Sequence, residues 1–142
     1  MWWSLGKTGD ELMTAAENKK LIREAFEAWG RGDGRPFFAL VADDVRWTVT
    51  GRTPISGTYT SKKEFRGVLK AMGEHLASDL KVVLRDVIAD GDKVAVEFES
   101  HAAGRNGTAY DQRYCWMLRV VDGRVREVVA YLDTELVSRL FA

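Results

Sequence analysis

The stretch from Lys93 to Asp133 constrains the fold more strongly than any other part of the chain. It contains three runs rich in β-branched and aromatic residues, joined by Asn106-Gly107 and by Asp122-Gly123. Asn-Gly and Asp-Gly pairs are strong hairpin signals because both residue types tolerate positive φ angles. The stretch is therefore predicted to form three consecutive antiparallel strands.

A two-residue turn at Asn106-Gly107 would place Glu99 opposite Tyr114 and Glu97 opposite Trp116. Side chains alternate between the two faces of a strand, so one face would be mainly polar and aromatic, with Glu97, Glu99, His101, Gln112, Tyr114 and Trp116. The other face would be apolar, with Val96, Phe98, Cys115 and Met117. We interpret the first face as the wall of a pocket, because an exposed sheet face seldom carries two large aromatic side chains. A solvated strand surface is the alternative.

The second hairpin is expected to have a three-residue loop with a bulge at Asp122-Gly123. Only that register sets Ala130 beside Tyr114 and Val128 beside Trp116. Both small aliphatic residues would then line the same pocket face.

The rest of the chain predicts helices first and strands late. Asp10 or Thr14 can cap the first helix, and Ser61 and Glu64 have the spacing of a capping box. The expected order is a tail over residues 1–9, helices over 10–29 and 37–41, strands over 45–50 and near 58–59, a helix from Ser61 to Leu76, a strand over 80–89, the three-strand stretch, and a helix ending at Leu140. This order predicts a single α+β domain over residues 10–142, with a curved antiparallel sheet over three N-terminal helices and a cone-shaped pocket between them.

Composition excludes several classes of function. The chain has 21 basic and 21 acidic residues, and this balance gives no reason to expect nucleic acid or a membrane surface as a partner. With no long apolar run and no leader-like start, the protein is expected to be cytoplasmic. His75, His101 and Cys115 do not form a zinc-ligand pattern, so no metal site is predicted.

Several short stretches resemble a known family. They are Asn18 to Leu21, Asp43 to Trp47, Ile55 to Tyr59, and Val121 to Val125 leading into Tyr131 to Asp133. They are similar to the nuclear-transport-factor-2-like superfamily, and within it to the SnoaL-like polyketide cyclase and ketosteroid-isomerase-related group. The resemblance covers residues 12–140 and implies an α+β barrel with a pocket, in a dimer that packs sheet to sheet.

The resemblance does not carry over a known set of catalytic residues. Where limonene epoxide hydrolases of this fold carry their catalytic groups, this chain has Trp47, Val49, Glu97, Glu99 and Ala130. Epoxide hydrolysis is therefore not expected. Near the oxyanion acid of ketosteroid isomerase the chain has Tyr114, which keeps a hydrogen-bond donor.

Two hypotheses of function follow. The first is a cofactor-free acid–base isomerase, cyclase or dehydratase acting on a hydrophobic carbonyl compound, with Glu99 as base, Tyr114 as oxyanion donor, and Glu97 or His101 as auxiliary. For this role the pKa of Glu99 is expected to be raised by burial and by Glu97. The alternative is a non-catalytic ligand-binding or dimerisation module.

Both hypotheses share the same pocket and partners. The expected partners are a small hydrophobic molecule and a second copy of the chain, docked through the face with Phe98, Cys115 and Met117. The expected pocket walls are Trp47, Trp116, Gln112, Val128, Ala130, Phe26, Tyr59 and Met72.

Overall fold

A computed structural model describes residues 13–142, so the predicted tail over residues 1–9 and the predicted helix start at Asp10 lie outside the described residues. The described elements are, in chain order, α2 (Ala15–Gly30), α3 (Arg35–Leu40), β1 (Val41–Val49), β2 (Gly57–Tyr59), α4 (Lys62–Gly73), β3 (Lys81–Asp90), β4 (Lys93–Ala103), β5 (Ala109–Val121), β6 (Arg124–Leu132) and α5 (Thr134–Leu140). Helices come first and strands late, as predicted.

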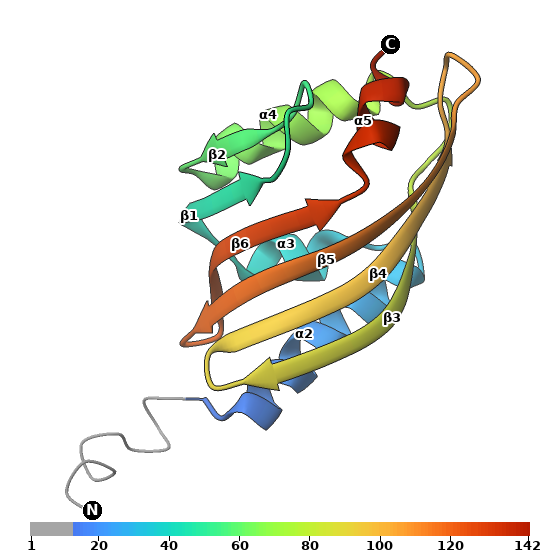
Figure 1. Ribbon diagram of the computed structural model, residues 1–142. Helices are drawn as coiled ribbons and strands as arrows, with labels where there is room; N and C mark the ends of the chain where they lie inside the picture. Colours follow the sequence, from blue (N-terminus) through green and yellow to red (C-terminus); the bar gives the residue numbers. More distant parts are fainter. Residues whose placement is uncertain (1–12) are drawn as a thin grey trace, which may run out of the picture.

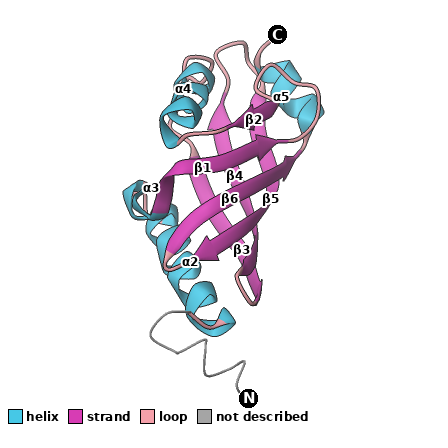
Figure 2. Ribbon diagram, turned by 90° about the vertical axis from the view of Figure 1, so that its left-hand side faces the viewer, coloured by secondary structure: helices cyan, strands magenta, loops and turns pink. Residues whose placement is uncertain are grey.

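The six strands form one curved sheet in the order β2-β1-β6-β5-β4-β3 (Figure 1). Strands β3 to β6 form an antiparallel meander, while β1 and β6 run parallel. Helices α2, α3 and α4 lie along one side of the sheet (Figure 2). The predicted α+β class, with a bent sheet over N-terminal helices, is confirmed.

The helices begin where the sequence places their caps. Thr14 caps α2 in a full capping box with Glu17, and the buried side of this helix carries Ile22, Ala25 and Phe26 at helical spacing. Ser61 accepts a hydrogen bond from the Glu64 amide at 3.0 Å. The Glu64 carboxylate binds Thr60 instead of closing the box on Ser61.

The first hairpin has a different turn from the predicted one. The Gly104 amide donates to the Thr108 carbonyl at 2.7 Å, which leaves a three-residue loop, Arg105 to Gly107. Gly107 has a φ of 89°, but Asn106 does not adopt the positive φ that a two-residue type I′ turn requires. The Asn106 side chain donates instead to the carbonyls of Arg139 and Ala142, at 2.8 and 3.1 Å.

This turn shifts the register by one residue. Tyr114 pairs with Phe98 and not with Glu99, while Glu99 pairs with Arg113. Since side chains alternate, a shift of one residue moves every side chain to the opposite face of the sheet. The predicted face assignment of β4 is therefore wrong: Val96 and Phe98 are buried on the inner side, and Glu97, Glu99 and His101 lie on the outer face.

The second hairpin also differs from its prediction. Asp122 and Gly123, with φ angles of 52° and 72°, form a two-residue turn, and Val121 pairs with Arg124. The register shift lies within the paired strands and not in the turn, between the pair Arg119–Glu127 and the pair Val120–Val125. Trp116 consequently pairs with Ala130, and Leu118 pairs with Val128. Ala130 and Val128 still face inward, as expected.

An aromatic cluster fills much of the space between the sheet and the helices. Phe26 contacts Phe37, Phe98 and Trp116, with ring centroids 4.9 to 5.9 Å apart.

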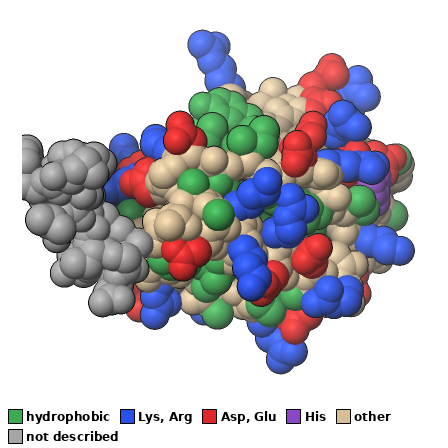
Figure 3. All heavy atoms as spheres, turned by 90° about the horizontal axis from the view of Figure 1, so that it is seen from below, with side chains coloured by type: hydrophobic (Ala, Val, Ile, Leu, Met, Phe, Trp, Pro, Cys, Tyr) green, Lys and Arg blue, Asp and Glu red, His purple; other side chains and the backbone are tan. Residues whose placement is uncertain are grey.

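No helix among the described residues is both long and apolar enough to cross a membrane. On the face shown in Figure 3, acidic and basic side chains are interspersed.

Candidate functional site

A small cavity of about 70 Å³ lies between the inner face of the sheet and α4. It is lined by aromatic and aliphatic residues: Trp29, Trp47, Val49, Ile55, Phe65, Val68, Leu69, Met72, Leu80, Phe98, Tyr110, Tyr114, Trp116, Ala130 and Leu132. Two phenols and three indoles provide the polar side-chain atoms of this wall. Drug-sized ligands usually occupy about 300–1,000 Å³, so this cavity is small in its present form.

Two strands bring Trp47 and Trp116 together in the cavity wall. Trp47 lies in β1 and pairs with Val128, while Trp116 lies in β5 and pairs with Ala130 on the same strand, β6. The two indoles meet nearly perpendicularly, at 84° and 5.0 Å between ring centroids. Phe65 of α4 stacks on Trp47 at 3.7 Å. Both tryptophans are thus held in place by their neighbours.

The indole N–H groups of Trp47 and Trp116 are buried, and neither has a hydrogen-bond acceptor among the described residues. A buried donor without a partner costs roughly 1–3 kcal/mol. Buried Trp N–H groups usually find an acceptor. Both residues thus line one cavity, and each carries an indole N–H without an acceptor among the described residues.

The two phenols in the wall stay neutral. The Tyr114 hydroxyl hydrogen-bonds with Ser100 Oγ at 2.8 Å, and burial raises the pKa of Tyr114 well above its ordinary value. Burial also raises the pKa of Tyr110. A neutral phenol can donate a hydrogen bond to a ligand but cannot act as a base near neutral pH.

Gln112 is fully buried, but its role is structural. Its amide oxygen accepts hydrogen bonds from the backbone N–H of Asp133 and of Arg113, at 2.8 and 2.9 Å. Its amide nitrogen donates to the Asp133 carbonyl at 2.9 Å and to the Tyr110 hydroxyl at 3.3 Å. Gln112 thereby ties the start of α5 to β5, and it does not line the cavity.

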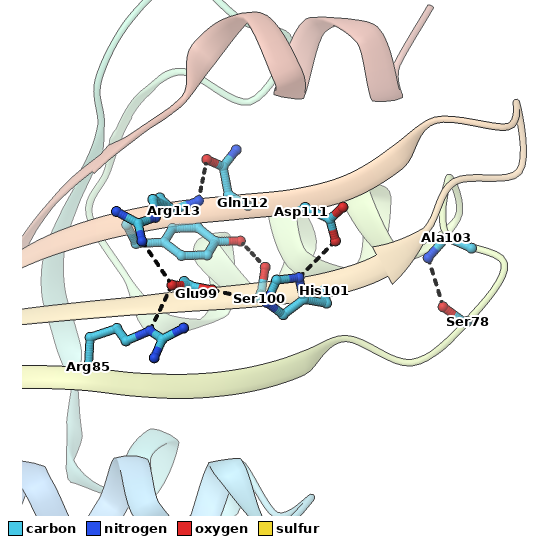
Figure 4. A network of polar contacts seen from close by, with 10 residues as sticks. Ser78, Arg85, Glu99, Ser100, His101, Ala103, Asp111, Gln112 and Arg113 are labelled. Carbon is cyan, nitrogen blue, oxygen red and sulfur yellow. Dashed lines mark hydrogen bonds and ion pairs between the residues drawn. The ribbon is translucent and has the colours of Figure 1, made fainter.

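Glu99, which was expected to be the base, lies outside the cavity (Figure 4). Its carboxylate accepts from Arg85 Nε at 2.7 Å and from Arg113 Nη2 at 3.2 Å. The hydrogen bond from Arg85 is the largest of the effects that lower the pKa of Glu99 to about 2, and they outweigh desolvation, which raises it. The predicted raised pKa is wrong, because the expected apolar wall is replaced by two guanidinium groups.

His101 bridges two carboxylates on the same outer face. Its Nδ1 lies 2.7 Å from Asp111, and its Nε2 lies 3.2 Å from Glu99. The hydrogen bond to Asp111 is the main effect that raises the pKa of His101. Glu97 is exposed and lies opposite Cys115. Of the four predicted catalytic side chains, only Tyr114 therefore lies in the cavity wall.

The structure agrees better with the predicted pocket-wall residues than with the predicted catalytic residues. Trp47, Trp116, Ala130 and Met72 line the cavity. Phe26 and Val128 are buried in the adjoining core, and the Tyr59 hydroxyl donates to the Ile55 carbonyl at 2.7 Å. The prediction included Met72 of α4 but missed Phe65, Val68 and Leu69, which recur at helical spacing on the same face of this helix.

Among the described residues, no group of three or more His, Cys, Asp or Glu side chains is placed to hold a metal ion.

The curved sheet over three helices, with an apolar cavity between them, is the architecture of NTF2-like proteins. The chain belongs to the SnoaL-like domain family, which matches residues 22–128. Among curated proteins it is similar to the uncharacterized protein Rv0034 of Mycobacterium tuberculosis, at 29% identity over 119 residues, or 80% of this chain and 86% of the relative.

Solved structures agree with this assignment. Bal32a from a soil-derived mobile gene cassette has a TM-score of 0.76 at 22% identity, covering 90% of this chain and 98% of that one. An NTF2-like protein of unknown function from Burkholderia pseudomallei has a TM-score of 0.73 at 25% identity, covering 87% and 95% of the two chains. The predicted superfamily and group are confirmed.

Proposed function

We propose that the protein binds a small apolar molecule that carries a hydrogen-bond acceptor. The observation that carries this proposal is the pair of buried indole N–H groups of Trp47 and Trp116, which have no acceptor among the described residues. A carbonyl or ether oxygen that reaches these N–H groups would satisfy donors that are otherwise unpaired. Tyr114 lies in the same wall, but its hydroxyl already hydrogen-bonds with Ser100 Oγ at 2.8 Å.

Binding is better supported than acid–base catalysis. None of the described residues that line the cavity is an Asp, Glu, His, Lys, Arg or Cys. Proton abstraction needs a base within hydrogen-bond reach of the substrate, directly or through one water. Glu99, the expected base, is held by Arg85 and Arg113 on the opposite face of the sheet.

The apolar part of the ligand would lie against aromatic rings. Phe98 and Tyr114 stack at 4.4 Å with their planes 12° apart, and Trp116 meets Phe98 edge-on at 4.8 Å. Flat aromatic surfaces of this kind favour a planar or alicyclic ligand. Specificity would come from the two indole donors, because the remaining wall is almost wholly apolar.

A matched pair of ligands tests this proposal. 2-Acetylnaphthalene carries a carbonyl oxygen, and 2-isopropenylnaphthalene replaces that oxygen with a CH₂ group of similar shape. We expect the ketone to bind about tenfold more tightly, equivalent to ~1.4 kcal/mol, in a titration followed by tryptophan fluorescence. Equal affinities would show that the indole donors are not used, and no binding of either compound would contradict the proposal.

We also propose that a second copy of the chain covers the outer face of the sheet. Since Phe98 faces inward, this surface differs from the predicted one. One uncharged row of paired residues crosses all six strands: Ile88, Ala95, Met117, Val129, Thr48 and Thr58. The exposed large hydrophobic side chains of the described residues, Ile88, Met117 and Tyr131, all belong to this face.

A further inference from the structure

The cavity is adjacent to a larger open cleft. This cleft, of about 480 Å³, lies between the end of α4, residues 76–80 and Arg105 of the β4–β5 hairpin. Four residues border both the cleft and the cavity: Trp29, Leu69, Met72 and Leu80. Side chains of these residues therefore form the partition between the two spaces.

The backbone around the cleft is held firmly on the hairpin side. The Ala77 amide donates to the Ala103 carbonyl at 2.7 Å, and the Ala103 amide donates to Ser78 Oγ at 2.8 Å. The Arg105 amide donates to the His75 carbonyl at 2.9 Å. These hydrogen bonds fix residues 74–80 to the hairpin. An opening between the cleft and the cavity therefore requires movement of side chains more than movement of this loop.

Met72 is the partition residue best suited to move. Methionine is unbranched, with three rotatable side-chain bonds, and adapts its shape more readily than leucine or tryptophan. It lies in the last turn of α4 and borders both spaces, while Gly73, next to it, has open space where a side chain would begin. A change of the Met72 rotamer would connect cavity and cleft.

We propose that the ligand site extends past Met72 and Leu69 into this cleft, and that the ligand is an elongated amphipathic molecule. The inference rests on the proposed function and adds the shape and the outer end of the ligand. The acceptor-bearing apolar end lies in the cavity against Trp47 and Trp116, and the body passes between Met72 and Leu69. A cleft of about 480 Å³ joined to the cavity falls within the ~300–1,000 Å³ range of small-molecule sites.

The outer end of this ligand is polar but carries no net charge. The cleft is lined at its open side by Ser78, Asp79 and Arg105, which supply a hydroxyl, a carboxylate and a guanidinium. One acidic and one basic side chain in the same cleft lining favour a neutral group that can both donate and accept, such as a hydroxyl or an amide.

A second cleft of about 460 Å³, between α3 and α4, is the competing entrance. Its charged lining residues, Arg35, Lys62 and Arg66, are all basic. It shares only Leu69 with the cavity, so a ligand entering there would have to displace more of the core. Because the first cleft shares four residues with the cavity, we favour it as the entrance for the ligand.

Two exposed alanines make a matched experiment possible, because Ala77 lines the first cleft and Ala39 lines the second. In a Cys115→Ser background, which removes the exposed native thiol, Ala77→Cys and Ala39→Cys are each modified with N-cyclohexylmaleimide. Binding of 2-acetyl-6-hydroxynaphthalene is measured before and after modification.

We expect modification of the Ala77→Cys variant to weaken binding at least tenfold, and modification of the Ala39→Cys variant to change it less than about twofold. If both unmodified variants bind the ketone and modification at position 77 has no effect, or modification at position 39 blocks binding instead, the proposed route is wrong while the proposed function stands. If the unmodified variants and the wild-type protein bind no ketone, both proposals fail.

Discussion

Trp47 and Trp116 meet edge to face in the wall of the cavity, with ring centroids 5.0 Å apart, and the indole N–H of each is buried without an acceptor among the described residues. Neither residue could be replaced by phenylalanine without losing a donor. Under the proposed function, this pair would give the cavity its chemical preference, since its remaining surface is almost entirely apolar.

Replacing either tryptophan should affect ketones selectively. We expect Trp47→Phe and Trp116→Phe each to weaken binding of 2-acetylnaphthalene by about 5- to 30-fold, and to change binding of 2-isopropenylnaphthalene much less, because only the ketone accepts a hydrogen bond. Trp29→Phe is the control, since Trp29 also lines the cavity but its N–H is not among the unpaired buried donors. Equal losses for both compounds would indicate a purely steric role.

Glu99 should matter for acid stability and not for binding. Its pKa is depressed to about 2, so its favourable interactions are fully present above the ordinary value of 4.5 and are lost as the pH falls toward 2. In wild type, the urea concentration at the midpoint of unfolding should fall as the pH drops from 4.5 to 2. In Glu99→Gln this fall should be smaller, and the affinity for the ketone should be unchanged. The matched control is Glu97→Gln, two residues away on the same face and exposed. A large loss of ketone affinity in Glu99→Gln would restore its catalytic interpretation.

His101 should titrate above its ordinary pKa of 6.5. A group with a raised pKa stabilises the fold fully below the unfolded value, and this contribution is lost as the pH rises through the folded value. Asp111 supplies the main effect, so Asp111→Asn should move the NMR titration midpoint of His101 downward. A midpoint at or below 6.5 in the wild-type protein would contradict the observed bridge between Asp111 and Glu99.

The outer face should hold two copies together. Met117 lies at the centre of the uncharged row, between Ala95 and Val129. Light scattering at micromolar concentration should give the mass of a dimer for the wild-type protein and of a monomer for Met117→Arg. The control is Ala39→Arg, at an exposed alanine of α3 that is not part of the uncharged row. A monomeric wild-type protein would refute the proposed interface.

The fold could be predicted because its signals are local. Each signal involves residues that are only a few positions apart. Examples are the cap at Thr14, the cap at Ser61, and the apolar stripe of Ile22, Ala25 and Phe26. Together with the late cluster of strands they define the α+β class. Trp47 and Trp116 could be assigned to the pocket because large aromatics in the middle of strands are seldom left exposed.

The predicted face of β4 is wrong, because the register of this strand depends on a contact that is distant in the sequence. The Asn106 side chain binds the carbonyls of Arg139 and Ala142 at the end of the chain, and the hairpin adopts a three-residue loop. Pattern alone cannot reveal this contact, yet it decides on which face Glu99 lies. Alternation of Val94, Val96 and Phe98 was the signal that favoured the correct face, and these three residues are buried.

The indole N–H signals in a ¹H–¹⁵N NMR spectrum test the central claim most directly. The chain has five tryptophans, and Trp47→Phe and Trp116→Phe assign the two signals of interest. We expect 2-acetylnaphthalene to move both protons downfield, as a new hydrogen bond does, while 2-isopropenylnaphthalene gives no such shift. If a bound ketone leaves both indole protons where they are in the free protein, Trp47 and Trp116 do not recognise an acceptor and the proposed basis of ligand selection is wrong.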